Sequence, residues 1–171
     1  MTSAKAPVVF IHGLWLHASS WQPWQELFAE AGYEPSAPGW PGDADTVEAT
    51  RAHPDAVANH GIDEVTNHYA GVIDKLPARP LFEAAAAAFS PHSPAQVNTG
   101  NQDRGPLLLT MGGKDHTVPE AITKSTVKQY RDSPAVTDLV EFADRGHSLT
   151  IDSGWREVAE ACLAWLTKQG R

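Results

Sequence analysis

The sequence predicts an α/β fold in which helices flank a mostly parallel β-sheet. Two observations lead to this prediction. Short apolar runs rich in β-formers alternate along the chain with segments of helical periodicity, as in proteins built from repeated strand–helix units. The first run, residues 7–11, is apolar without interruption, which is typical of a strand covered on both faces.

The first half of the chain contains two predicted strands and two predicted helices. Ser20 is the expected N-cap of the first helix, and Gly32 is expected just past its end. The second helix places Val65, Tyr69 and Val72 on one apolar face. In order, we expect a strand at 7–11, a helix at 21–31, a strand at 33–37, a long loop at 39–61 and a helix at 63–76.

The second half begins with a five-alanine run that favours a helix over residues 81–89, followed by a loop rich in proline. The alternation of strands and helices then returns. The last helix is the clearest in the chain, because its apolar residues form one stripe, on which Cys162 lies. The expected elements are a strand at 107–111, a helix at 120–131, a strand at 137–142 and a helix at 155–168.

Composition excludes several classes of partner. At 171 residues the chain fits one domain, and its formal charge of −8 opposes binding to nucleic acid or anionic lipid. No apolar run reaches the length of a membrane span, and the N-terminus lacks a secretory signal, so we expect a cytoplasmic protein. Cys162 is the single cysteine, which excludes an internal disulfide. Nothing in the sequence implies a cofactor.

Three loops that follow predicted strands carry candidate chemistry. After the first strand come His12, Gly13, Leu14 and Trp15, where Gly13 permits a sharp turn that presents backbone N–H groups. Asp115 follows the strand at 107–111, and His147 follows the strand at 137–142. Because the carboxyl ends of parallel strands form the site in such sheets, we expect these loops to carry function. Taken singly, each has a plain structural explanation as a turn or a helix cap.

Together the three loops resemble those of the α/β-hydrolase superfamily, whose acid precedes its histidine along the chain. His12-Gly13-Leu14-Trp15 resembles the oxyanion loop, Gly112-Gly113-Lys114-Asp115 the acid loop and Gly146-His147-Ser148 the histidine loop. The resemblance implies that Asp115 orients His147 as general base. It further implies that Leu14 and Trp15 supply the oxyanion hole and that His12 and Gly13 support it.

The chain departs from that family at the nucleophile. No Gly-x-Ser-x-Gly occurs, and none of the ten serines lies between a buried strand and a helix. We infer an internal deletion near Pro80 that removes the central strands, the nucleophile elbow and the cap. A natural deletion, an engineered one and an error in the recorded chain would all leave this sequence. Residues 1–80 then form the oxyanion-side half, 81–104 a cap or linker remnant, and 105–171 the acid and histidine half of one truncated α/β-hydrolase-like domain.

Without a nucleophile, the acyl-enzyme route is closed, at a cost of roughly 10⁶ in kcat for a comparable triad. Ser19, Ser20 and Ser148 are better explained as capping or turn residues, and Cys162 as a core thiol. Direct activation of water by His147 is the remaining route. Trp15, Trp21, Trp24 and Trp40 could line an apolar pocket, but packing on the sheet is the more common use of such residues.

Two functions remain open from the sequence. One is hydrolysis of a small ester-like or related acyl substrate, impaired in this chain. The alternative is a non-catalytic α/β binding module or an inert remnant. Metal binding is disfavoured, because His53, His60 and His68 match no standard ligand spacing. Loss of central strands exposes sheet edges, so we expect homo-oligomerisation, or else pairing of the strand at 7–11 with that at 107–111.

Overall fold

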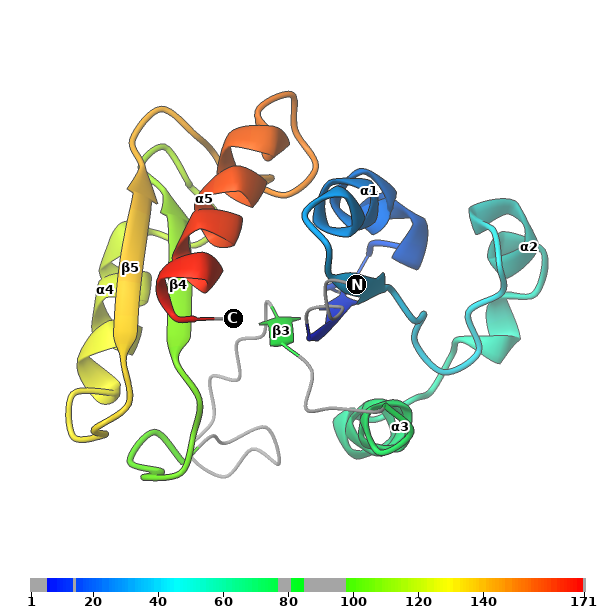
Figure 1. Cartoon of the computed structure of the whole chain (residues 1–171). Helices are drawn as coiled ribbons and strands as arrows, with labels where there is room; N and C mark the ends of the chain where they lie inside the picture. The colour runs from blue at the N-terminus through cyan, green and yellow to red at the C-terminus, as the bar shows by residue number, and fades with distance from the viewer. Residues whose placement is uncertain (1–5, 14, 77–80, 85–97, 171) are drawn as a thin grey trace. The chain divides into compact units, whose positions relative to one another are not determined.

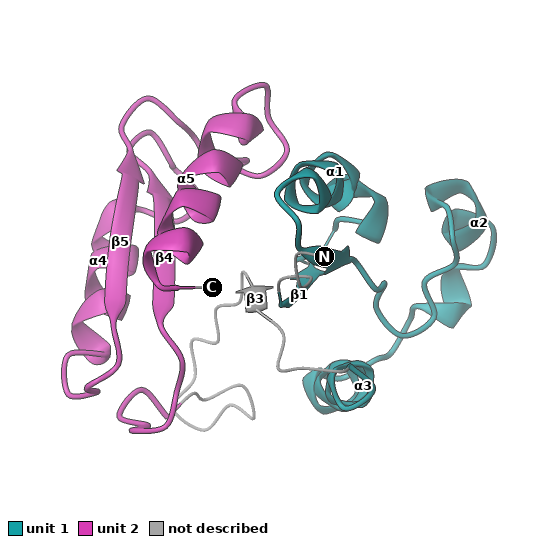
Figure 2. Cartoon of the chain, viewed as in Figure 1, with its two compact units in different colours: residues 1–96 teal, residues 97–171 magenta. Residues whose placement is uncertain are grey.

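The computed structural model describes residues 6–13, 15–76, 81–84 and 98–170. The chain divides into two compact units, residues 1–96 and 97–171 (Figure 2). Each unit contains its own sheet, and all the strand pairs are parallel. The predicted α/β class is therefore confirmed, while the single-domain organisation stays a prediction. No helix in the described part of the chain is long and apolar enough to span a membrane.

The sheet of unit 1 is built around β1 (Pro7–Ile11), which lies between β2 (Glu34–Ser36) and β3 (Leu81–Ala84) (Figure 1). Val8, Val9 and Phe10 are at most 3% exposed. This burial explains why residues 7–11 are apolar without interruption, and it confirms the prediction of a strand covered on both faces.

An aromatic cluster attaches the first helix to β1. The 3₁₀ helix η1 (Ala18–Trp21) leads into α1 (Gln22–Glu30). Phe10 lies 5.1 Å, centroid to centroid, from both Trp21 and Phe28, and Trp24 packs edge-on against Phe10. Trp21 and Trp24 are thus core residues rather than pocket residues.

The ends of this helical segment correct one prediction and confirm another. Ser20 caps neither helix; the N-cap of η1 is His17, whose Nδ1 accepts the N–H of Ser19, and α1 continues directly from the 3₁₀ turn. Gly32 follows α1 with φ +89°, the left-handed conformation expected of a glycine past a helix end.

The segment expected to be a long loop contains two short helices, α2 (Val47–Ala52) and η2 (Pro54–Ala56). The Thr46 hydroxyl caps α2 by accepting the N–H of Ala49 at 3.1 Å. Neither helix buries a residue, so neither leaves an apolar periodicity in the sequence. The helix α3 (Ile62–Ile73) buries Val65 and Tyr69 on the predicted face.

The structure contradicts the helix expected at 81–89, since residues 81–84 form β3; residues 85–89 lie outside the described part of the chain. β3 pairs with β1 in parallel, with Val8 opposite Leu81 and Ile11 opposite Ala84. The backbone groups of β1 on the side away from β2 need partners, and this requirement outweighs the helix propensity of alanine. Of the two alternatives expected from the sequence, the pairing of β1 with the strand at 107–111 is therefore wrong.

Unit 2 holds β4 (Leu107–Gly112) and β5 (Thr137–Phe142), with α4 (Glu120–Gln129) and α5 (Trp155–Lys168) on opposite sides of the strand pair (Figure 1). The buried side chains of α5 form the predicted stripe, and the Trp165 indole donates to Asp138 Oδ2 at 2.7 Å. The stripe residues are Val158, Ala159, Cys162 and Leu166, so the prediction of a buried core thiol is confirmed.

Candidate active site

Two loops meet at the carboxyl ends of β4 and β5, where the acid and the histidine were predicted. The N–H of Lys114 donates to the Arg145 carbonyl at 2.8 Å, which joins the loops backbone to backbone. Gly112 makes this approach possible, because a Cβ there would lie 2.5 Å from the carbonyl oxygens of both Arg145 and Gly146. Gly112 thus allows the backbones of the acid loop and the histidine loop to cross closely.

The crossing brings Asp115 and His147 together. Nδ1 of His147 lies 2.9 Å from Oδ2 of Asp115. The Asp115 carboxylate is an acceptor, so Nδ1–H of His147 donates to it, and in a neutral imidazole the lone pair then resides on Nε2. The aspartate side chain is 10% exposed and the histidine side chain 55% exposed, so the pair has a covered acid and an accessible base. This is the arrangement of a carboxylate-oriented general base.

The other oxygen of Asp115 is held by the backbone. Oδ1 accepts the N–H groups of Thr117 and Val118 at 2.8 and 2.9 Å. Burial acts to raise the pKa of Asp115, but these two bonds and the contact with His147 outweigh it and lower the pKa below its usual value. The Asp115 carboxylate is therefore ionised near neutral pH.

The histidine loop is anchored on its far side. The Arg145 guanidinium forms an ion pair with Asp152, just ahead of α5, and Leu149 is buried. The Ser148 carbonyl accepts the N–H groups of Ile151 and Asp152 at 3.0 and 2.9 Å. Ser148 is thus a turn residue that helps to fix the segment following His147.

In unit 1 the candidate oxyanion turn follows β1, and Leu14 lies outside the described residues. The N–H of Leu16 donates to the Gly13 carbonyl at 3.3 Å, which closes the turn. The left-handed residue is Trp15, with φ +73°, rather than Gly13, where a Cβ would meet nothing within 4 Å. Glycine is therefore not required for the turn itself, in contrast to the sequence prediction. Trp15 is 93% exposed.

His12 directly precedes this turn and contacts Asp43, a residue that was not predicted from the sequence. Its Nε2 is 3.1 Å from Oδ2 of Asp43, and the same oxygen accepts the N–H of Trp40 at 2.9 Å. The Trp40 ring stacks on the His12 ring, with centroids 5.8 Å apart. The Gly-Trp-Pro-Gly-Asp segment, residues 39–43, was the available signal, but nothing in its spacing pointed to His12.

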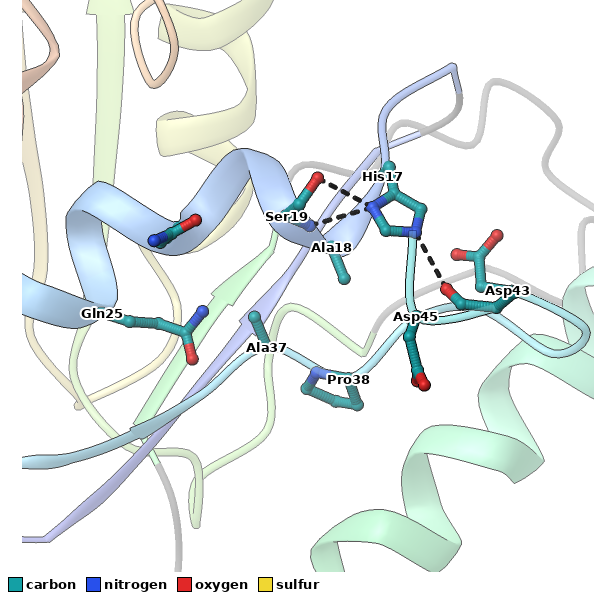
Figure 3. Close-up of a pocket in the computed structure, with 11 residues that line it drawn as sticks. His17, Ala18, Ser19, Gln25, Ala37, Pro38, Asp43 and Asp45 are labelled. Carbon is teal, nitrogen blue, oxygen red and sulfur yellow. Dashed lines mark hydrogen bonds between the residues drawn. The ribbon is translucent and has the colours of Figure 1, made fainter. Parts of the chain in front are cut away.

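A hollow of about 480 Å³ lies beside this segment in unit 1, lined among others by His17, Ser19 and Asp43 (Figure 3). The Ser19 hydroxyl donates to His17 Nδ1 at 2.8 Å, and His17 Nε2–H donates to the Ala44 carbonyl at 3.0 Å. Because Nδ1 also accepts the Ser19 N–H, this contact is part of the cap of η1.

Two of the three histidines weighed as metal ligands, His60 and His68, have other partners. His60 contacts Glu64 and the Ala56 carbonyl, and His68 contacts the Gly39 carbonyl at 3.1 Å. Among the described residues, no three His, Cys, Asp or Glu side chains gather as a metal site would need.

Solved structures with similar folds include a hydrolase, lipolytic enzymes and an esterase. One is a predicted CIB-like hydrolase from Thermoplasma acidophilum (21% identity, 97% of this chain, 88% of that chain, TM-score 0.56). Another is a structure reported for the metagenome-derived lipolytic enzymes LipS and LipT (16% identity, 96% of this chain, 94% of that chain, TM-score 0.65). A third is esterase 2 from Thermogutta terrifontis, phosphonylated by cyclosarin (14% identity, 98% of this chain, 83% of that chain, TM-score 0.57). No curated protein sequence matches the chain.

The chain shares the fold of these hydrolases, and a family profile confirms the resemblance inferred from the three loops. The sequence profile of the dienelactone hydrolase family matches residues 72–168, more than half of the chain, including both Asp115 and His147. The chain belongs to the dienelactone hydrolase family.

Proposed function

We propose that this protein hydrolyses small ester-like or lactone-like acyl compounds slowly, with His147 as general base toward water and Asp115 as its orienting acid. The observation that carries the proposal is the 2.9 Å contact between His147 Nδ1 and Asp115 Oδ2. The exposed histidine ring leaves Nε2 open to a water molecule and a substrate.

The reaction follows from the tautomer that Asp115 fixes. Nε2 of His147 takes a proton from water while the water oxygen attacks the carbonyl carbon of the substrate, which gives a tetrahedral oxyanion. The oxyanion collapses, the bond to the leaving alkoxide breaks, and Nε2–H returns the proton to it. The resemblance assigns the oxyanion donors to Leu14 and Trp15, and this assignment stays a prediction.

The proposed rate is low because the sequence contains no Gly-x-Ser-x-Gly motif. General-base catalysis alone contributes about 10²–10⁴-fold, well short of a complete triad. In the sequence, four alanines at 85–88 follow directly after β3, the strand that pairs with β1. Those alanines offer no nucleophile, which favours a step with water over an acyl-enzyme.

Family membership and the names of the similar structures support this class of substrate. A dienelactone is a cyclic ester, and the similar structures include lipolytic enzymes and an esterase. Ester and lactone hydrolysis share the carbonyl attack that a positioned base promotes.

The competing function is a non-catalytic binding module or inert remnant, and the missing elbow is the observation that favours it. Hydrolysis of p-nitrophenyl acetate by purified protein separates the two. We expect His147→Ala to lower the second-order rate constant by about tenfold or more, and Asp115→Asn to lower it as well. His116→Ala is the matched control, since His116 is an exposed histidine next to Asp115. Equal rates for wild type and His147→Ala would leave the binding module as the better account.

A further inference from the structure

Arg145 links three parts of unit 2 at the start of the histidine loop. Its backbone N–H donates to the Phe142 carbonyl at the end of β5, at 3.0 Å, and its own carbonyl accepts the Lys114 N–H of the acid loop at 2.8 Å. Its guanidinium forms an ion pair with Asp152, just ahead of α5. One residue therefore contacts the end of a strand, the acid loop and the approach to a helix.

The Arg145 guanidinium is packed closely and partly shielded from water. The Arg145 side chain is 18% exposed and that of Asp152 30%, whereas both side chains of the Arg156–Glu160 pair on α5 are 59% exposed. Solvent therefore screens the first pair less than the second. Gly154 leaves the space that the guanidinium fills, since a Cβ there would overlap Nη1 of Arg145. Asp152 is also fixed, because its Oδ1 accepts the Gly154 N–H at 3.0 Å.

We propose that Arg145 is a positioning residue for His147, and that it acts by closing the histidine loop against Asp152. His147 lies between the two members of the ion pair along the chain, in a segment that buries Leu149. The Ser148 carbonyl accepts the Asp152 N–H at 2.9 Å, which closes the second part of this segment. The segment that carries the base is thus tied at both ends. The catalytic consequence of this closure rests on the function proposed above.

His147 needs this support because its ring is only partly enclosed. Its side chain is 55% exposed, and Nδ1 lies 2.9 Å from Asp115 Oδ2. A half-exposed side chain keeps rotamer freedom that packing would otherwise remove, so the backbone beneath it decides whether the contact forms. A hydrogen bond weakens steeply with distance, and a loop shift of about 1 Å would take the two atoms out of range.

The Nδ1 proton of His147, observed by NMR of the full chain near neutral pH, tests the positioning role. We expect its exchange with solvent to speed up about tenfold in Arg145→Gln and in Asp152→Asn, while the Val140 amide in β5 is unchanged, since the loop opens locally. In Asp152→Asn the amide oxygen still accepts the Gly154 N–H, so that variant removes the charge alone. The double variant should match either single variant, because both act through one contact.

Arg156→Gln is the matched control, because it breaks an exposed ion pair on α5 and should leave the Nδ1 proton of His147 unchanged. An unchanged exchange rate in Arg145→Gln would overturn the positioning role. Equal acceleration in Arg156→Gln, or at the Val140 amide, would also overturn it, because the effect would then be a general loss of stability.

Hydrolysis of p-nitrophenyl acetate by the same variants connects the position of His147 to its proposed role. We expect Arg145→Gln to lower the second-order rate constant about tenfold, as misplacement of a catalytic group does, and Arg156→Gln to leave it unchanged. An unchanged rate constant in Arg145→Gln beside an active wild type would contradict the positioning role. Absence of His147-dependent hydrolysis in the wild type would refute the proposed function alone, because the NMR measurement needs no substrate.

Discussion

Replacing Gly112 by alanine should separate the two loops of the candidate active site. The new Cβ would lie 2.5 Å from the carbonyl oxygens of Arg145 and Gly146, and ordinary contact begins near 3.4 Å, so the loops must part by roughly 0.9 Å. A displacement of that size along the 2.9 Å contact between Asp115 and His147 exceeds hydrogen-bonding range. Overpacking against backbone atoms costs about 2 kcal/mol of unfolding free energy.

Urea unfolding and NMR together check this prediction, with Gly146→Ala as the matched control. A Cβ at Gly146 would meet only the Lys114 carbonyl oxygen, at 3.9 Å, so that variant should keep wild-type stability. The Nδ1 proton of His147 should be visible in the wild type and in Gly146→Ala, and lost in Gly112→Ala. If Gly112→Ala matched Gly146→Ala in both stability and this signal, the close crossing of the loops would be refuted.

Three further predictions concern the core, the acid and the sheet edges. Trp24→Ala should lower the free energy of unfolding in urea by about 3–5 kcal/mol, and Trp15→Ala by less than about 0.5 kcal/mol. The reason is that the Trp24 side chain is 1% exposed and the Trp15 side chain 93% exposed. Similar losses in the two variants would contradict the assignment of Trp24 to the core. Because the folded pKa of Asp115 is lowered, its contribution to stability is full above about pH 3.9 and is lost as the pH falls through that lowered pKa. The urea midpoint should therefore drop more steeply on acidification for wild type than for Asp115→Asn. Parallel plots of the midpoint against pH would contradict a stabilising contribution from the Asp115 carboxylate. We also propose that edges of the short sheets pair between copies, so light scattering should give a mass that rises with concentration, whereas a constant 18.4 kDa would exclude this.

The elements that the sequence predicted well are those that bury an apolar face. β5 and α5 begin and end at the predicted residues, and β1 was identified from its continuous apolar run. α2 was missed because it buries nothing, and its signal was only the capping threonine at 46. β3 was missed because alanine propensity is local, whereas the demand of β1 for a second partner strand is not.

Part of the candidate site could likewise be predicted from the sequence, and part of it could not. Asp115 and His147 could be placed together because each follows a strand of one parallel pair, and parallel strands end at the same edge. Asp43 could not be predicted as the partner of His12, since the two are 31 residues apart and joined by a loop whose path depends on its glycines. The left-handed position also fell on Trp15 rather than on the glycine that the sequence favoured.

We propose that His147 acts on water in a chain that carries no activated serine. Intact mass spectrometry of the purified protein after incubation with a fluorophosphonate probe tests it most directly, since such probes react with activated serines; the similar Thermogutta terrifontis esterase is phosphonylated by cyclosarin. We expect an unchanged mass of 18.4 kDa in a preparation that still hydrolyses p-nitrophenyl acetate in a His147-dependent way. A single adduct, lost in one serine variant together with the hydrolysis, would contradict it.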